Sequence, residues 1–286
     1  MMNVSAIVPI YNSVNTLKKA IQSLLIQPEI DEIFIVDDGS SDGSFELAKE
    51  LESRYALINV LTHEKRKNKG AAASRNLGLK HCKNEWVQFL DADDELLPNK
   101  ISINIKSLSS DCSFLVGNSI FNKGGKIYKR HYWINTSIGL LVTRLGVTSS
   151  NLWCKSSLNQ IGGWNEDLSS SQEYDLMLRL IKLNLKVSFC ADYLSIIHEL
   201  PSSISRNKSL NNERLVNSIR FRESVKEYLI RENQFGFLEK MYYHGVLGSI
   251  CRKYNLTLTY SIFFYYLFKI YKSFSDRILS PEYTIN

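Results

Sequence analysis

The sequence predicts an α/β fold in which a mostly parallel central sheet is flanked by helices and followed by a helical C-terminal extension. Short apolar runs alternate with amphipathic stretches through the first hundred residues, as in chains that build parallel sheets. Aspartates directly follow two of these runs, at the carboxyl edge where an open parallel sheet presents its ligands. From about Asn211 onward the pattern is helical. With 286 residues, 44% of them apolar, the chain can bury a full core.

Strands and helices are expected to alternate over the first 98 residues. We predict strands over 4–9, 32–36, 58–61 and 86–90. Helices are predicted over 15–25, from the turn at 37–43 to about residue 54, and over 70–79. The first helix has its apolar residues on one face, and Ser13 or Asn15 can cap its start. This β-α-β-α-β-α-β order is typical of parallel strands joined by right-handed crossovers.

The pattern is less regular beyond residue 98. We predict a hairpin over 117–132, an extended stretch over 146–155, a helix over 170–183, and short strands over 187–190 and 194–197. The helix is indicated by leucines that share one face. Ser170 and Glu173 at its start have the spacing of a capping box.

Cysteine usage and the N-terminal residues indicate a protein that stays in the cytoplasm. The five cysteines are scattered without a CxxC pair, so neither a zinc site nor a disulfide framework is predicted. The first residues lack the basic region, long apolar stretch and cleavage site of a secretion signal. We therefore expect a reducing, cytoplasmic environment.

The net positive charge of the chain lies entirely in its last third. Residues 1–200 carry 22 basic and 22 acidic side chains, whereas residues 201–286 carry 13 and 7. Within this tail, 258–272 is aromatic with interspersed lysines, but it falls short of the roughly 20 apolar residues that cross a bilayer. Two interpretations stay open: peripheral contact with the inner face of the cell membrane, or packing as core. No nucleic-acid-binding motif is present, so no nucleic acid partner is expected.

Two clusters of aspartates follow predicted strands. Asp37-Asp38 comes after the run 33–36, and Asp91-Ala92-Asp93-Asp94 comes after the run 86–90. Carboxylates that converge on one sheet edge repel one another unless a cation lies among them, and hard oxygen ligands suit Mg²⁺ or Mn²⁺. The pattern therefore predicts a metal-bound phosphate ester. The alternative for the first cluster, together with Asp42, is a polar turn that caps the next helix.

Other phosphate-binding motifs are absent from the sequence. There is no GxxxxGK[ST] loop, and the glycines near the first two strands do not form GxGxxG. A P-loop NTPase and a dinucleotide-binding dehydrogenase are therefore disfavoured. The missing glycine-rich, lysine-containing nucleotide loop also argues against a nucleotidyltransferase.

Six short motifs occur along the chain in a characteristic order and spacing. They are Val8-Pro9-Ile10-Tyr11-Asn12, Val36-Asp37-Asp38-Gly39-Ser40-Ser41-Asp42, Ala73-Ser74-Arg75-Asn76-Leu77-Gly78, Leu90-Asp91-Ala92-Asp93-Asp94, Gly162-Gly163-Trp164-Asn165-Glu166 and Gln172-Glu173-Tyr174-Asp175-Leu176. Together they resemble the family 2 glycosyltransferases, which have the GT-A (Rossmann-like) nucleotide-sugar fold. The resemblance covers roughly residues 3–200. It implies a catalytic domain over 1–205, divided into a nucleotide-binding half (1–98) and an acceptor-binding half (99–205), and a helical extension over 206–286.

The resemblance also implies roles for residues that match the nucleotide-binding motifs. Pro9 and Tyr11 would border the nucleobase, Asp38 would accept its imide proton, and Arg75 would reach the base or ribose. Asp91-Ala92-Asp93 matches the DxD motif, in which Asp91 would lie near the ribose and metal. Asp93 would ligate the divalent cation, Mn²⁺ or Mg²⁺, that bridges the diphosphate.

On the acceptor side, Glu173 stands where the family usually has an aspartate general base. The alternative is that Glu173 only closes a capping box. Trp164 and Asp175 are assigned to the acceptor side, although Asp175 could instead position the start of the helix. His198 is a candidate contact to the metal or diphosphate, or a half-buried structural histidine, because Ile196 replaces an arginine that relatives often have.

The predicted function is metal-dependent, inverting transfer of a sugar from a nucleotide-sugar, most simply UDP-linked, to a glycan or a lipid-diphosphate-linked saccharide. The negative charge on the departing diphosphate calls for a cation, and a hydroxyl nucleophile calls for a carboxylate base. The resemblance alone places this reaction in O-antigen or capsule synthesis. The alternatives are an inactive carbohydrate-binding or scaffold protein on the same fold and a nucleotidyltransferase.

Overall fold

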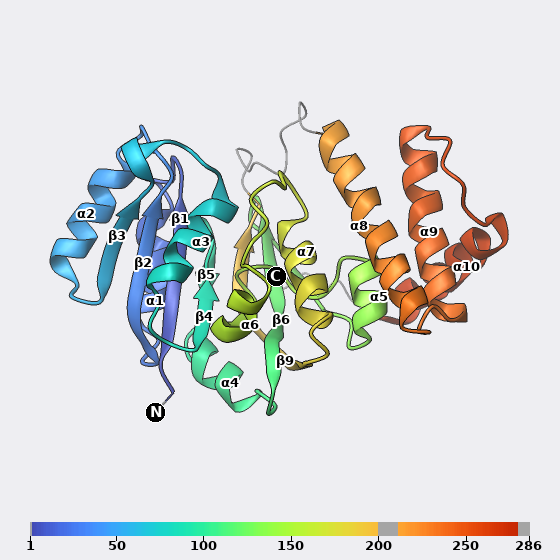
Figure 1. Ribbon diagram of the computed structural model, residues 1–286, viewed down its shortest axis with the longest axis horizontal. Coiled ribbons are helices and arrows are strands. Elements are labelled where there is room, and N and C mark those ends of the chain that lie inside the picture. Colours follow the sequence, from blue (N-terminus) through green and yellow to red (C-terminus); the bar gives the residue numbers. More distant parts are fainter. Residues whose placement is uncertain (1, 200–210, 280–286) are drawn as a thin grey trace.

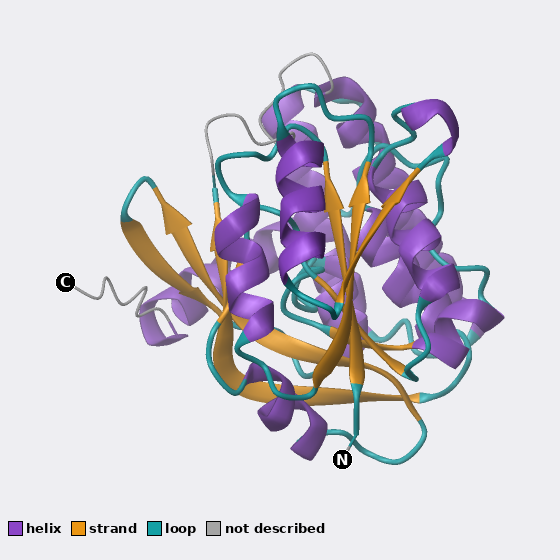
Figure 2. Cartoon of the chain, turned by 90° about the vertical axis from the view of Figure 1, so that its left-hand side faces the viewer, coloured by secondary structure: helices purple, strands orange, loops and turns teal. Residues whose placement is uncertain are grey.

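In the part of the chain that the computed structural model describes, residues 2–199 and 211–279, nine strands form one curled sheet with helices on both faces (Figures 1 and 2). The strands are β1 (Val4–Ile10), β2 (Ile30–Asp37), β3 (Ile58–Thr62), β4 (Trp86–Phe89), β5 (Glu95–Leu96), β6 (Cys112–Lys123), β7 (Lys126–Arg130), β8 (Leu152–Cys154) and β9 (Lys186–His198). The helices are α1 (Leu17–Leu25), α2 (Ser44–Arg54), α3 (Ala71–His81), α4 (Lys100–Lys106), α5 (Thr136–Leu141), α6 (Lys155–Gln160), α7 (Gln172–Ile181), α8 (Asn211–Arg231), α9 (Phe237–Tyr254) and α10 (Ile262–Leu279), with a short 3₁₀ turn at Glu64–Arg66.

The strands β1 to β4 are parallel, as predicted, and lie side by side in the order β3-β2-β1-β4. Both faces of this half are covered. Ile33 and Ile35 of β2 pack with apolar residues of α1 and α2, whereas Phe34 and Val36 belong to the cluster that includes α3. Because successive side chains of a strand point to opposite faces, a strand covered on both sides needs a continuous apolar run.

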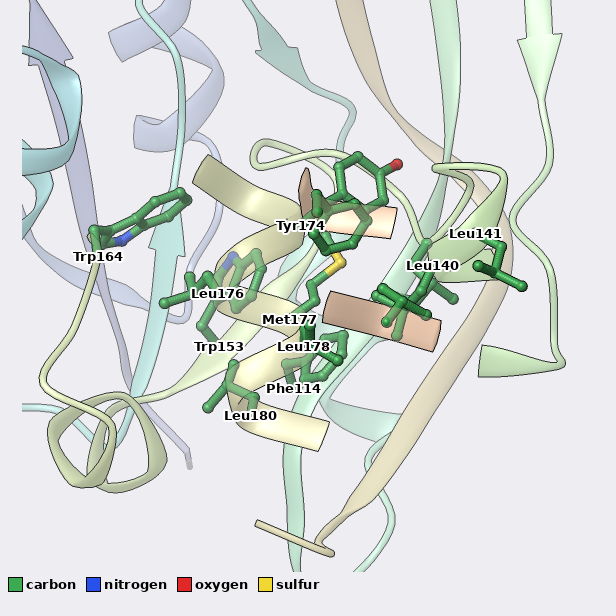
Figure 3. Packing of buried hydrophobic residues seen from close by; sticks show 14 of the residues in the cluster. Phe114, Leu140, Leu141, Trp153, Trp164, Tyr174, Leu176, Met177, Leu178 and Leu180 are labelled. Carbon is green, nitrogen blue, oxygen red and sulfur yellow. The ribbon is translucent and has the colours of Figure 1, made fainter. Parts of the chain in front are cut away.

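The second half of the sheet is mixed. Strand β8 is antiparallel to both β4 and β6, β6 is parallel to β9, and β9 is antiparallel to β5, which comes directly after the second aspartate cluster. The predicted hairpin is present as β6 and β7. Beneath α7, buried side chains such as Trp153, Leu176 and Leu180 fill the space against the sheet (Figure 3).

Three local predictions were wrong. The N-cap of α1 is Thr16, without a side-chain cap, rather than Ser13 or Asn15. Only Leu152–Cys154 is a strand within the stretch predicted to be extended, because residues before it form a turn with Ser150 N–H donating to the Val147 carbonyl. The two short strands expected near 187–197 are one strand, β9, whose pairing with β6 shifts register along its length.

The predicted capping box at the start of α7 is also absent. Ser171, with φ at 58°, is the N-cap and makes no side-chain cap hydrogen bond. The Ser170 hydroxyl instead accepts a hydrogen bond from the Asn217 amide of α8 (3.3 Å). The Glu173 carboxylate is therefore not engaged in capping with Ser170.

The helices α8 to α10 lie at the end of the molecule opposite β3 (Figure 1): α8 packs on α5 and α7, α9 packs on α5 and α8, and α10 packs on α9. Helices α9 and α10 approach closely because α9 has glycines at their contact: a Cβ on Gly245 would lie 2.1 Å from Phe268 Cγ. Phe268 and Tyr265 are buried, so core packing is confirmed for the inner face of the aromatic segment. Within the described ranges, no helix combines the length and apolar character that crossing a bilayer requires. The predicted boundary at residues 205 and 206 lies outside the described residues.

Candidate active site

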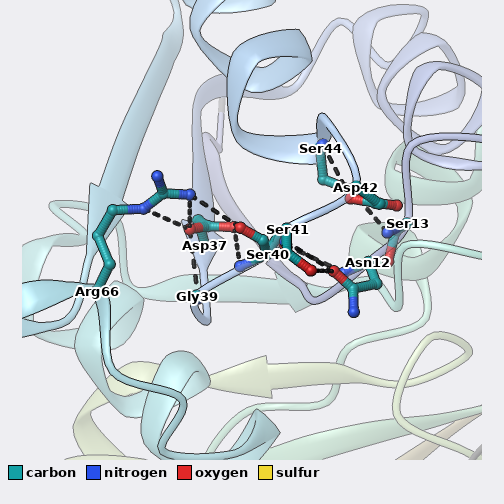
Figure 4. Close-up of polar contacts among 9 residues, drawn as sticks. All are labelled: Asn12, Ser13, Asp37, Gly39, Ser40, Ser41, Asp42, Ser44 and Arg66. Carbon is teal, nitrogen blue, oxygen red and sulfur yellow. Dashed lines mark hydrogen bonds and ion pairs between the residues drawn. The ribbon is translucent and has the colours of Figure 1, made fainter.

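Asp37, the last residue of β2, shapes the turn that follows the strand (Figure 4). Its buried carboxylate accepts hydrogen bonds from the backbone N–H groups of Gly39 (3.3 Å) and Ser40 (3.1 Å) and pairs with Arg66 (3.1 Å). Asp42 acts similarly at the start of α2, where its carboxylate accepts a hydrogen bond from the backbone N–H of Ser44, the first helical residue (3.0 Å). The polar-turn interpretation is therefore confirmed for these two aspartates.

Asp38 is bonded differently from its neighbour. Its buried carboxylate accepts backbone N–H groups of Lys69 (2.7 Å) and Gly70 (2.8 Å), so it holds the loop before α3 against the end of β2. Each carboxylate oxygen can accept a further hydrogen bond. The adjacent strand β1 carries Pro9, and Tyr11 just beyond it is 49% exposed. These three residues border the same carboxyl edge of the sheet, where the sequence predicts a nucleobase.

The second aspartate cluster follows β4 and concentrates negative charge. Burial and, to a smaller extent, the neighbouring Asp91 carboxylate raise the pKa of Asp93 to about 6. Asp94 is buried, accepts hydrogen bonds from the Ser149 hydroxyl (2.5 Å) and the His198 backbone N–H (3.2 Å), and has its pKa raised by burial and by both neighbouring aspartates. The mutual repulsion of these groups is the condition that a bound cation relieves.

The cluster can supply two carboxylates to a divalent ion, from Asp91 and Asp93. Within residues 2–199 and 211–279, no group of three or more Asp, Glu, His or Cys side chains forms a complete metal site. Two carboxylates nevertheless suit Mg²⁺ or Mn²⁺, because such ions commonly take one or two protein carboxylates and complete their coordination with substrate phosphates and water. The donor set therefore fits an ion that binds together with a diphosphate.

Arg75 connects this cluster to the start of α7. From the middle of α3, its Nη2 pairs with Asp91 Oδ1 (2.6 Å) and its Nη1 donates to the Gln172 side chain (3.4 Å). The guanidinium lies 4.5 Å above the ring of Trp164. Arg75 is 6% exposed, so its position is fixed by these contacts. The positive charge of Arg75 therefore lies next to Asp91 and acts on Glu173, the residue that follows Gln172 in α7.

Glu173 is partly buried in the first turn of α7. Burial raises the pKa of its carboxyl group; Arg75 and Arg130 oppose the rise, and Asp91 adds to it. The charges of Arg75 and Asp91 therefore reach Glu173, although Glu173 is more than 80 positions from Asp91 in the sequence. Asp91, Arg75 and Glu173 are thus brought together by β4, α3 and α7.

Trp164 and Asp175 support these elements. Trp164 is 2% exposed and packs edge-on against Phe89 (5.2 Å between ring centroids). This burial favours a role beneath Arg75 over the acceptor contact predicted from the sequence. The Asp175 carboxylate accepts Arg179 Nε (2.8 Å). Arg179 also donates to the carbonyl of Gly163 (2.7 Å), so this pair ties α7 to the loop before it.

His198, at the end of β9, is partly buried and already has a partner. Its Nε2 lies 2.5 Å from Glu95 Oε1, and Glu95 in turn pairs with Lys19 (2.7 Å). The imidazole is close enough to Asp93 for a positive charge on it to lower the pKa of that carboxyl. A metal contact through Nε2 would require His198 to exchange Glu95 for the ion.

Sequence reasoning missed Asn76 and Arg130. The Asn76 side chain accepts a hydrogen bond from the Trp164 backbone N–H (2.8 Å) and donates one to the Glu166 carboxylate (2.7 Å), so it joins α3 to the loop before α7. Its inclusion in the third motif was the available signal. Arg130, at the end of β7, acts on Glu173 through its charge, and nothing in the local sequence indicates this proximity.

Sequence comparison connects this arrangement to known enzymes. The profile of glycosyl transferase family 2 matches residues 5–165. The chain is 31% identical over 209 residues to the Escherichia coli UDP-Glc:alpha-D-GlcNAc-diphosphoundecaprenol beta-1,3-glucosyltransferase WfgD, covering 72% of this chain and 80% of the relative. It is 25% identical over 233 residues to an Escherichia coli chondroitin synthase, covering 79% of this chain but only 34% of that longer relative.

Comparison with solved structures gives the same fold. Staphylococcus aureus TarS 1–349 in complex with UDP-GlcNAc aligns with a TM-score of 0.60 at 19% identity, covering 88% of this chain and 81% of TarS 1–349. A Pyrobaculum calidifontis mannosyltransferase in complex with GDP-Man and Mn²⁺ aligns with a TM-score of 0.61 at 12% identity, covering 98% of this chain and 81% of the mannosyltransferase. The expected GT-A fold is thereby confirmed. The profile match and the extended similarity to WfgD show that this chain belongs to glycosyl transferase family 2.

Proposed function

We propose that the chain is a metal-dependent, inverting glycosyltransferase that moves a sugar from a UDP-sugar to a hydroxyl of a lipid-diphosphate-linked saccharide or glycan in bacterial surface polysaccharide synthesis. The observation that carries this proposal is the convergence of Asp91, Arg75 and Glu173, with Asp93 beside them. A TarS structure holds UDP-GlcNAc, and WfgD is named for a UDP-Glc donor and a diphosphoundecaprenol acceptor, which supports the donor and acceptor classes.

In this proposal the nucleotide half lies over 1–98 and the acceptor half over 99–205. Tyr11 and Asp38 would receive the nucleobase at the ends of β1 and β2, and Arg75 would orient the ribose while holding Asp91. A bound Mg²⁺ or Mn²⁺, held by Asp91 and Asp93, would supply positive charge to the departing diphosphate. His198 joins these ligands only if it leaves Glu95.

The acceptor half supplies the base. Glu173 would take the proton of the acceptor hydroxyl as the oxygen attacks the anomeric carbon. Its carboxylate forms no capping box with Ser170, and the charges of Arg75 and Asp91 both act on its pKa, which supports this role. Attack from the side opposite the leaving diphosphate would invert the anomeric centre, giving a β-linked product from an α-linked donor.

The configuration of the product tests this proposal. We expect the protein with Mg²⁺ or Mn²⁺, a UDP-sugar panel and a GlcNAc-diphospholipid acceptor to release UDP and form one new β-linkage, resolved by the anomeric coupling in proton NMR. An α-linked product would contradict the assignment of an inverting base. Formation of a nucleotide-sugar from a sugar phosphate would identify a nucleotidyltransferase instead, and sugar binding without turnover would identify an inactive scaffold.

The outer face of α10 supports contact of this enzyme with a membrane surface. Ile262, Phe263, Tyr266 and Ile270 are 52–66% exposed and follow one another at helical spacing, while the opposite face packs on α9. Lys269 is exposed on the same helix, so apolar and cationic groups suit anionic head groups and the acyl boundary together.

Vesicle binding tests this contact. We expect the protein to co-sediment with phosphatidylglycerol vesicles more strongly than with phosphatidylcholine vesicles. Combined I262Q and F263Q substitutions should weaken binding at least roughly tenfold, because two apolar side chains no longer enter the lipid. I230Q is the control, since Ile230 is also more than half exposed but lies on α8, outside this face. Equal vesicle binding by the wild type, the double variant and I230Q would exclude the α10 face as the membrane contact.

A further inference from the structure

A small cleft in the acceptor half is lined by basic side chains. Its walls include Arg130 and His131 at the end of β7, together with Arg144 and the segment 146–147. Arg130 is held in place, since its Nη2 donates to the Thr143 carbonyl (2.9 Å) and its guanidinium lies 5.3 Å from the Phe121 ring. The cleft is thus built from the β6–β7 hairpin and the loop that follows α5.

This cleft adjoins the proposed base. The Tyr174 hydroxyl donates to the Gly146 carbonyl (3.0 Å), which fixes the cleft wall against the first turn of α7. Tyr174 is the residue next to Glu173, and the Arg130 charge acts on both of them. A ligand in the cleft would therefore lie next to the place where the acceptor hydroxyl must be.

Positive charge dominates the surroundings of the cleft. Burial lowers the pKa of His131, and the charges of Arg144 and Lys129 lower it further. Acidic side chains nearby include Glu173 and Asp192, whose charge acts on Tyr132 in the cleft wall. A polyanion that entered the cleft would meet Arg130 and Arg144 in its walls, with Lys129 close enough for its charge to act on His131. Arginine forks suit phosphate oxygens.

We propose that this cleft binds the diphosphate of a lipid-linked acceptor and so sets the distance between the acceptor sugar and Glu173. The inference rests on the proposed function and adds to it an anion subsite separate from the donor site at Asp91 and Asp93. A diphosphate fits better than a single carboxylate, because two arginines, Arg130 and Arg144, line the cleft and can each pair with one phosphoryl group. The helices α8 and α9 pack on α5, and α10 packs on α9, so this helical extension would bring the lipid chain to the α10 face.

Calorimetry with geranyl diphosphate as the probe tests the subsite. UDP and Mg²⁺ are present at saturation, with Mg²⁺ in excess over all diphosphate, so that the donor site is filled. We expect binding by the wild type and at least about tenfold weaker binding by R130Q and by R144Q, with UDP affinity unchanged. K126Q is the matched control, because it removes a positive charge from the exposed tip of the same hairpin.

Further variants and ligands distinguish the possible outcomes. If R130Q lowers the midpoint of thermal unfolding, R130K, which keeps the charge, should bind geranyl diphosphate more tightly than R130Q. Absence of geranyl diphosphate binding while UDP still binds would overturn the subsite alone, whereas absence of UDP binding would overturn the proposed function. Equal binding of geraniol, or displacement of the probe by glucuronate at equal concentration, would overturn the assignment to a diphosphate.

Discussion

We expect Glu173→Gln to lower the rate of sugar transfer by roughly 10²-fold to 10⁴-fold while UDP affinity stays within about twofold of the wild type. Glutamine keeps the size of the side chain but cannot take the acceptor proton. UDP affinity is preserved because Asp91, Asp93 and Arg75 are unchanged. The measurement is kcat with a GlcNAc-diphospholipid acceptor, together with a UDP titration.

The control for this variant is Glu50→Gln, which removes an exposed carboxylate that pairs with Arg54 on α2. Its transfer rate should equal that of the wild type. Unaltered turnover by Glu173→Gln would remove Glu173 from its role as the base. A loss of UDP affinity to match the loss of rate would instead indicate that the substitution disturbs the donor site through Arg75 and Gln172.

Asp93→Asn should lower transfer by roughly 10²-fold or more, because the stabilisation that a bound cation gives the leaving group is worth several kcal/mol. It should also remove the dependence of UDP affinity on Mn²⁺. The control is Asp111→Asn: Asp111 is exposed at φ 58°, a conformation that asparagine tolerates. Transfer by Asp93→Asn that remained fast and Mn²⁺-dependent would exclude Asp93 as a ligand.

The parallel half of the sheet was predictable because its signals are local. Each strand of β1 to β4 is a short apolar run, and each intervening helix has its own apolar face. The mixed half depends on pairing between distant segments: β9 pairs with β6 more than 60 residues earlier and with β5 about 100 residues earlier. Such pairing leaves no local pattern in the sequence, so one bent strand was predicted as two.

Candidate site residues could be identified from the sequence where a motif names them, but not where the fold alone brings charges together. The proximity of Asp91 to Arg75 follows from the motifs, and the structure pairs them at 2.6 Å. The different bonding of Asp37 and Asp38 could not be predicted, since it depends on which way each of the two side chains points at the end of β2. The proximity of Arg130 to Glu173 requires the β6–β7 hairpin to fold back towards α7.

The most direct test of a metal-bound nucleotide donor is calorimetric titration of the wild type and Asp93→Asn with UDP, GDP and dTDP, each with Mn²⁺ and again with a chelator. We expect the wild type to bind UDP selectively and only with Mn²⁺, and Asp93→Asn to show no difference between the two conditions. Binding that is independent of Mn²⁺ in the wild type, or no binding of any nucleotide, would contradict the account.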